Sequence, residues 1–134
     1  QLKLAGKGIG KLDIQGEQVQ VTDYVENAVD FVSENDVCIV PLKSGSGIRL
    51  KILEAMAAGK LVISTTVGAQ GIAYQKDVHL LIADSPEDYA KIYKSLLNGE
   101  IDFKKIVRNA RTLIEDNYST SALAKKQLEI YKAL

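Results

Sequence analysis

This sequence of 134 residues lacks tryptophan and has only one cysteine and one histidine. With Cys38 alone, an intramolecular disulfide is excluded and a cytosolic setting is favoured. Because Cys38 stands in an apolar run, we interpret it as a small buried hydrophobe. His79 has no histidine or cysteine near it in the sequence, so we predict that no metal is bound. The same isolation argues against Ser–His–Asp or Cys–His catalysis, and we interpret His79 as structural.

Net charge and long apolar runs are absent as well. The 17 basic and 17 acidic residues cancel, which argues against a nucleic-acid partner. No apolar run approaches the roughly 18 residues of a membrane-spanning helix. The apolar stretch within the first ten residues is too short for a signal peptide. Hydrophobic residues still make up 46% of the sequence, which is enough for the core of one globular domain.

Short apolar runs alternate with helical patterns, which is typical of a parallel α/β sheet. The expected strands are residues 2–4, 19–21, 37–41, 61–64 and 79–83. The expected helices between them are residues 27–33 and 48–58, and Gly59 is suited to end the second helix in a left-handed conformation. We predict a single Rossmann-like domain, residues 1–134, in which helices flank a parallel sheet.

Three further helices are expected towards the C-terminal end. Ser85 and Pro86, followed by two acidic residues, form the start signal of the first, and Gly99 ends it. Ser119 is a candidate cap for the third. The second helix is expected to bury apolar residues spaced three and four apart, namely Phe103, Ile106, Val107, Ala110, Leu113 and Ile114. The apolar stripe of the third consists of Leu123, Leu128, Tyr131 and Leu134.

The N-terminal edge departs from the usual order of a doubly wound domain, which opens with a strand, a phosphate-facing turn and a helix. Here a link rich in glycine and lysine leads from the first strand directly to another strand. We therefore expect a piece of a larger protein that lacks the first strand and helix of its domain. An uncovered sheet edge of this kind predicts self-association of the isolated chain.

The turn Ser44-Gly45-Ser46-Gly47 is the first candidate site. It follows a strand and so lies at the carboxyl edge of the sheet, where open α/β folds bind ligands. Glycine lets a ligand approach the main chain, and the N–H groups at the start of the next helix favour a phosphate. The alternative is a flexible link, for which serine and glycine are common. The turn matches neither the dinucleotide fingerprint nor the P-loop pattern.

Two cations, Arg49 and Lys51, flank Leu50 just inside the expected helix. A cation is disfavoured in a first helical turn unless an anion lies nearby. Residues two apart point about 200° away from each other, so at most one of the two faces the turn directly. The alternative is that both are solvated, which is slightly favoured for Lys51.

Glu54 is the one carboxylate of this helix. Because the surrounding sequence is apolar nearly all round, we expect Glu54 to be buried and to need a partner. A carboxylate held in this way suits two hydroxyls of a ribose. The alternative is a surface ion pair with Lys51, three residues earlier. A phosphate at the turn and hydroxyls at Glu54 together describe a nucleotide-sugar site.

A second turn, residues 65–71, follows the next strand at the same edge of the sheet. Its glycines and side-chain oxygens either face the donor or only reverse the chain direction, and the sequence leaves both interpretations open.

At these residues the sequence resembles the C-terminal, donor-binding domain of retaining GT-B glycosyltransferases of the family-4 type (glycosyl transferases group 1). The resemblance is carried by PLKSGSGIRLKILEAMAAGKLVIST at 41–65, by the following GAQGI, and by NAR-x-L-I-E-D-N-Y-S at 109–119. It runs from about residue 20 to the end and implies the C-terminal half of a GT-B fold. That family has a motif of two glutamates separated by seven residues.

The resemblance places the second glutamate of the motif on Glu54 and assigns it to the ribose hydroxyls of a nucleoside diphosphate. The first falls on Ser46, a departure from the family that affects the contact to the donor sugar. Another family glycine, in the loop beside the base, falls near Asp23. The phosphate-binding Arg and Lys of the family follow a strand that this sequence lacks. The implied donor-binding residues are Gly45, Ser46, Gly47, Ile48, Arg49, Lys51 and Glu54, with Ser46 and Arg49 as catalytic candidates.

These observations predict the donor-binding part of a glycosyltransferase that moves a sugar from a nucleotide-sugar to a glycan or lipid-linked acceptor, with retention. The resemblance implies glycan biosynthesis, no cofactor, an acceptor bound through an absent domain, and a cytoplasmic parent protein at the membrane surface. Two alternatives are a nucleotide-sugar-binding module without transferase activity and an interaction domain whose glycine turn is only structural.

Overall fold

The computed structural model describes residues 1–11, 13–14 and 16–133, and it divides the chain into two compact units. Unit 1 is Gln1–Phe31 and unit 2 is Val32–Leu134. Leu134, which belongs to the predicted stripe of the last helix, lies outside the described residues. The two units are defined by contacts within this chain alone, and the prediction of one domain stays a prediction.

Unit 1 is built on two parallel strands, β1 (Leu2–Ala5) and β2 (Val19–Thr22), which pair from Leu2 opposite Val19 onwards. Between them lies a 3₁₀ turn, η1 (Ile9–Lys11), in the link that the sequence marked as rich in glycine. Two strands follow one another without an intervening α-helix, as predicted. The loop after β2 is tied back to the link, because the Gly10 N–H donates to Asp23 Oδ1 at 2.7 Å.

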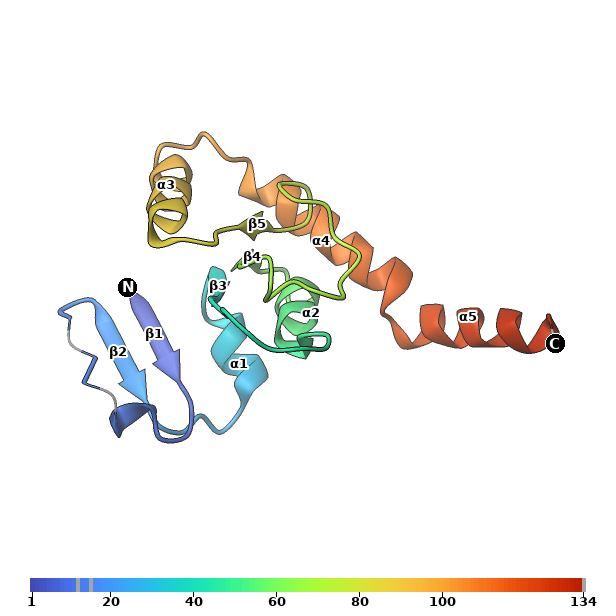
Figure 1. The fold of residues 1–134 in the computed structure, drawn as a ribbon, viewed down its shortest axis with the longest axis horizontal. Helices are drawn as coiled ribbons and strands as arrows, with labels where there is room; N and C mark the ends of the chain where they lie inside the picture. Colours follow the sequence, from blue (N-terminus) through green and yellow to red (C-terminus); the bar gives the residue numbers. More distant parts are fainter. Residues whose placement is uncertain (12, 15, 134) are drawn as a thin grey trace. The chain divides into compact units, whose positions relative to one another are not determined.

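The helix α1 (Ala28–Ser33) leads into unit 2, whose sheet has three parallel strands in the order β3–β4–β5. These strands are β3 (Val37–Val40), β4 (Leu61–Ser64) and β5 (Leu81–Ile82). Helix α2 (Leu50–Ala57) connects β3 to β4, and α3 (Pro86–Leu97) follows β5. The chain continues with α4 (Phe103–Asn117) and α5 (Thr120–Lys132) (Figure 1). The predicted α/β class with parallel strands and flanking helices is confirmed.

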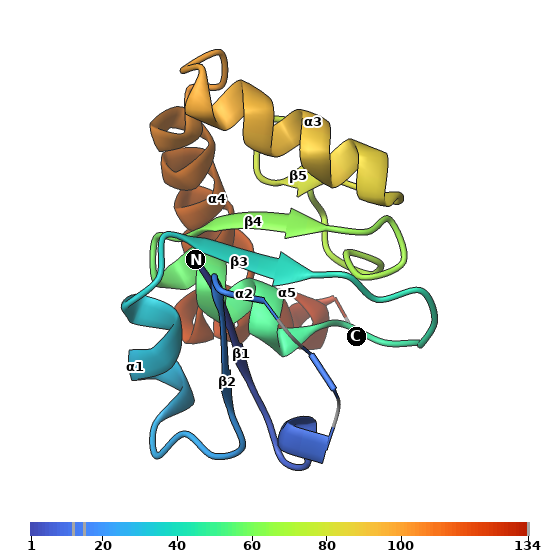
Figure 2. The ribbon, with the colours of Figure 1, turned by 90° about the vertical axis from the view of Figure 1, so that its left-hand side faces the viewer.

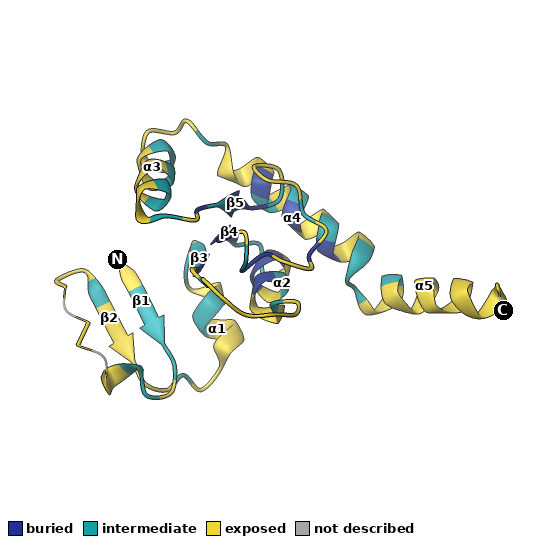
Figure 3. Cartoon of the chain, in the orientation of Figure 1, coloured by how far each residue is buried: buried dark blue, intermediate teal, exposed yellow. Residues whose placement is uncertain are grey.

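Two apolar clusters lie on opposite faces of this sheet, because alternate residues of a strand point to opposite sides. One cluster joins Val40 and Val62 of the sheet to α2 and α4. The other joins Leu61, Ile63 and Leu81 to α3 and to Ile106 of α4. Strand β4 is buried along its whole length and is the centre of the core (Figure 3).

Local start and stop signals were predicted well. Ser85 and Asp88 form a reciprocal capping box at α3, and Ser119 caps α5 through the Ala122 N–H. Gly59 ends α2 with φ +71°, and Gly99 follows α3 with φ +70°. Both glycines take the left-handed conformation that other residues avoid.

Several predicted details are wrong. Strand β5 is two residues long instead of five, and His79 lies in a turn before it. Phe103, predicted to be buried, is 45% exposed at the first position of α4, where only the later turns reach the core. The predicted apolar stripe of α5 is present, and its described residues are exposed, since α5 extends away from α4 (Figures 1 and 3).

Candidate functional site

The candidate site lies at the carboxyl edge of the sheet in unit 2. All three strands are parallel, so the segments that leave β3, β4 and β5 emerge at the same edge. Figure 2 shows the arrowheads of β3 and β4 pointing the same way, with the following loops at that end. Edges of this type hold ligands in open α/β sheets.

The first turn, Ser44–Gly47, links β3 to α2 in this edge, as predicted. Gly45 has φ +131° and Gly47 has φ +83°, conformations that residues with a side chain rarely adopt. A Cβ atom added to Gly47 would meet nothing within 4 Å, so the space beside its main chain is open. Within the described part of the chain, the N–H groups of Gly47 and Ile48 donate to no protein acceptor. The turn thus presents exposed, unpaired donors.

Helix α2 begins at Leu50, two residues later than predicted, and this shift changes the position of Arg49. Arg49 is the N-cap residue with extended geometry, and no side chain caps the helix start. The Arg49 guanidinium folds back over the turn, where Nη1 donates to the Ser46 carbonyl at 2.7 Å. Lys51, by contrast, is exposed in the first turn of the helix. An uncapped helix start beside two cations favours an anion.

Glu54 is exposed, which corrects the prediction of a buried carboxylate. Only one face of helix α2 is buried, and that face consists of Ile52, Ala55 and Met56. Glu54 is two residues from Ile52 and therefore points about 200° away from it. The alternative ion pair with Lys51 is also wrong, since Glu54 has no ion pair or hydrogen bond among the described side chains. The carboxylate is open to a ligand.

In the second turn, residues 65–71, Thr65, Gly68 and Ala69 are buried, and this turn packs beneath the first. The Thr65 side chain is 6% exposed, and its Oγ1 donates to the Leu42 carbonyl and accepts from the Gly68 N–H at 2.9 Å. A Cβ at Gly68 would collide with Ser64 Oγ, so only glycine fits there. Gly71 approaches Ile48 closely, which brings the two turns together. We call this arrangement of Ser64, Thr65, Gly68 and Leu42 the hydroxyl junction.

Sequence reasoning missed Asp84, which follows β5 at the same edge. Its carboxylate accepts hydrogen bonds from the Thr66 N–H and from Thr66 Oγ1, both at 2.7 Å. Thr66 and Asp84 are 18 positions apart in the sequence, so no local sequence pattern indicates their contact. Its position directly after a strand was the available signal, because polar residues at that point meet at one edge.

Cys38, predicted to be a buried hydrophobe, is only partly buried and packs against the apolar cluster that contains α2, and the structural role of His79 stays a prediction. Burial raises the pKa of the Cys38 thiol, while the positive charge of Lys51 acts in the opposite direction. His79 Nδ1 accepts from the Gln75 N–H at 2.9 Å, and burial lowers the pKa of the His79 imidazole. Among the residues that the structure describes, no group of three or more His, Cys, Asp or Glu side chains is placed to hold a metal ion.

The structure therefore places the predicted residues Gly45 to Lys51 in one loop and helix start, with Glu54 one turn further along α2. Asp23 lies in unit 1, where its carboxylate is used by Gly10. No described helix is long and apolar enough to cross a membrane.

Two known proteins are similar in sequence to most of this chain. An uncharacterized 44.6 kDa protein of the cps region of Klebsiella pneumoniae is 27% identical, over 89% of this chain and 34% of that protein. An uncharacterized glycosyltransferase of Methanocaldococcus jannaschii is 27% identical, over 81% of this chain and 28% of that protein. This chain spans about a third of the length of these relatives.

A solved structure of Anabaena HepE in complex with UDP and glucose superposes on 98% of this chain and 40% of its own, with a TM-score of 0.75 and 15% sequence identity. That likeness shows the GT-B glycosyltransferase fold. The family described as glycosyl transferases group 1 matches residues 1–99. The chain belongs to the group 1 glycosyltransferases.

Proposed function

We propose that this chain is the donor-binding part of a retaining glycosyltransferase of the family-4 type, and that it binds a nucleoside diphosphate sugar at the carboxyl edge of unit 2. The parent protein transfers the sugar to a glycan or lipid-linked acceptor in glycan biosynthesis. The acceptor is held by a domain outside this chain, and the parent acts in the cytoplasm at the membrane surface.

The observation that carries the proposal is the placement of unpaired donors and an unpaired carboxylate on one helix and its leading turn. The N–H groups of Gly47 and Ile48 are exposed and have no acceptor among the described residues, and the start of α2 is uncapped. Such a helix start binds phosphate through its N–H groups and its partial positive charge. Arg49 and Lys51 add two positive charges beside it.

Glu54 supplies the other end of the site. It lies four residues after Leu50, which corresponds to about 6 Å along the axis of α2. The ribose hydroxyls of a nucleoside diphosphate lie several bonds from its phosphates, so one ligand spans the turn and the carboxylate. The bound UDP and glucose of the Anabaena structure, which has this fold, support a ligand of that class.

The chemistry that follows is electrostatic. The N–H groups of the turn stabilise the negative charge that develops on the departing diphosphate, while the acceptor attacks from the same face. Donors that are already oriented towards developing charge are usually the largest catalytic contribution. Ser46 stands at the position of the family's first glutamate, and its hydroxyl contacts the donor sugar instead of that carboxylate.

Calorimetric titration of the full-length protein with nucleoside diphosphates tests the proposal. Glu54→Gln removes a charged acceptor and should weaken binding by about 1.5–3 kcal/mol, which is roughly tenfold or more in Kd. The matched control is Glu129→Gln, which neutralises an exposed glutamate on α5 and should leave the affinity unchanged. Unchanged affinity of Glu54→Gln for every nucleoside diphosphate tested would remove the assignment.

A further inference from the structure

The Arg49 side chain, which the sequence offered as an anion ligand, is used in the structure on the protein itself. Nη1 donates to the Ser46 carbonyl at 2.7 Å, and the guanidinium lies against Gly45 so closely that a Cβ there would overlap it. Arg49 Nε is shielded from solvent and has no partner among the described residues. The side chain is thus half-buried against the inner side of the turn.

The bond to Ser46 has a consequence for the neighbouring residue. The carbonyl of Ser46 and the N–H of Gly47 belong to one planar, trans peptide unit, so they point in opposite directions. With the Ser46 carbonyl held towards Arg49, the Gly47 N–H is turned away from Arg49. Gly47 is exposed, and its N–H donates to no acceptor among the described residues, so this donor is left for a ligand.

The conformation of the turn needs such an anchor. Gly45 and Gly47 both have positive φ, and glycine is the residue with the most backbone freedom to lose on ordering. Ser44, Gly45, Ser46 and Gly47 are all exposed, so burial does not fix this peptide. A charge-assisted hydrogen bond from Arg49 is the strong contact available to do so.

We propose that Arg49 is a positioning residue: by holding the Ser46 carbonyl, it orients the Gly47 N–H towards the diphosphate. The inference rests on the proposed function, since it assigns the way in which that same site is shaped. Arg49 acts through the backbone of the turn, and the phosphate is met by the peptide that Arg49 holds.

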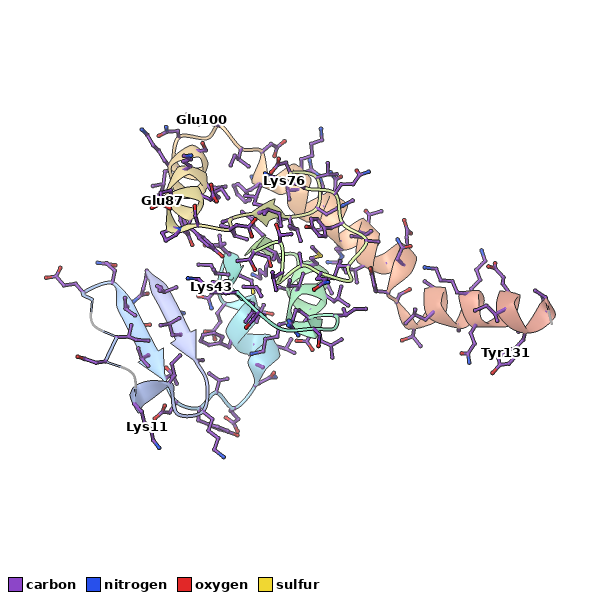
Figure 4. All side chains as sticks on the ribbon, viewed as in Figure 1. Lys11, Lys43, Lys76, Glu87, Glu100 and Tyr131 are labelled. Atoms are coloured by element: carbon purple, nitrogen blue, oxygen red, sulfur yellow. The ribbon has the colours of Figure 1, made fainter. Side chains whose placement is uncertain are left out.

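Three variants of the full-length protein separate positioning from simple charge. Arg49→Met removes the donor and the charge at similar length, and Arg49→Lys keeps a charged donor that can reach the carbonyl three residues back. Lys43→Met is the control, because it removes an exposed charge one residue before the turn and leaves both partners of the Arg49–Ser46 bond in place (Figure 4). We expect Arg49→Met to weaken nucleoside diphosphate binding about tenfold. Arg49→Lys should recover most of that loss, and Lys43→Met should change the affinity less than twofold.

A second measurement uses the ligand-free protein labelled with ¹⁵N-glycine. The order parameter of the Gly47 amide should fall from that of ordered backbone to that of a flexible loop in Arg49→Met and stay high in Lys43→Met. An unchanged Gly47 order parameter in Arg49→Met overturns the inference, as does an equal loss of affinity in Lys43→Met. If Arg49→Met does not fold, the order parameters of wild type and Arg49→Lys decide it, because a flexible Gly47 amide in both would overturn the inference.

The two proposals fail in different ways. If the wild-type protein binds no nucleoside diphosphate, the proposed function is wrong. If the wild type binds and Arg49→Met binds equally well, the function stands and only the role of Arg49 is wrong.

Discussion

We predict that the stability of the fold depends on a single oxygen atom of the hydroxyl junction, Thr65 Oγ1. Thr65→Val keeps the shape of the side chain and removes Oγ1. That atom donates to the Leu42 carbonyl and accepts from the Gly68 N–H at 2.9 Å. Thr65 and Gly68 are buried and Leu42 is half-buried, so water does not readily replace the lost partner.

The expected cost follows from the two groups that lose their partner. A buried donor or acceptor left unsatisfied costs about 1–3 kcal/mol, with the half-buried Leu42 carbonyl at the low end, which gives about 2–4 kcal/mol for Thr65→Val. Thr65→Ser is the matched control, since it keeps the hydroxyl and loses one methyl group, at about 0.8 kcal/mol. The polar change should therefore destabilise the fold more than the loss of the methyl group.

Equilibrium unfolding in urea measures the difference. The chain has six tyrosines and no tryptophan, so tyrosine fluorescence reports the transition, and Tyr74 and Tyr118 pack on the same apolar cluster. With an m-value of about 2 kcal/mol/M, Thr65→Val should lower the midpoint by about 1–2 M. A midpoint for Thr65→Val at or above that of Thr65→Ser would refute the reasoning, because it would show that the hydroxyl contributes no more to stability than the methyl group.

Two further predictions concern single polar groups of unit 2. Tyr89 Oη is shielded from solvent and has no partner among the described residues, so Tyr89→Phe should leave the free energy of unfolding in urea unchanged or raise it. Tyr118 Oη accepts a hydrogen bond from the Ala73 N–H at 2.8 Å, so Tyr118→Phe should lower that free energy by about 1 kcal/mol or more. The hydrogen bond from the Ser85 hydroxyl lowers the pKa of the Asp88 carboxyl, so the stability it contributes is full above the ordinary value of about 3.9 and is lost as pH falls through the lower pKa of the folded state. Asp88→Asn should therefore flatten the acid limb of a plot of unfolding free energy against pH, and an unaltered limb would assign it to other carboxyls.

Features that depend on neighbouring residues in the chain were predictable from the sequence. The capping box at Ser85 and the left-handed Gly59 follow from short-range chemistry, and the structure has both. The alternation of strands and helices likewise set the parallel topology and brought the two turns to one edge of the sheet.

Features that depend on which face of a helix is covered were not predictable in the same way. The exposure of Glu54 depends on the angular position of the buried face Ile52, Ala55 and Met56, and the apolar sequence around it does not show which face meets the sheet. Helix α2 begins at Leu50, two residues later than its pattern suggests, and the sequence did not indicate that Arg49, which precedes it, bonds to Ser46. The Thr66–Asp84 contact joins two loops that only the sheet brings together.

The polar groups at the sheet edge divide into those used by the protein and those left for a ligand. The Ser46 carbonyl is held by Arg49, the Thr65 hydroxyl by Leu42 and Gly68, and the Asp84 carboxylate by Thr66. Two kinds of unpaired group at this edge matter for the ligand. N–H donors lie at the turn and an acceptor, the carboxylate of Glu54, lies further along α2.

A nucleoside diphosphate has anionic oxygens at one end and ribose hydroxyls further along, so it offers acceptors to the donors and donors to the acceptor. A ligand with phosphate alone would leave the Glu54 carboxylate without a donor. The same division of groups therefore favours a nucleoside diphosphate over inorganic phosphate or diphosphate.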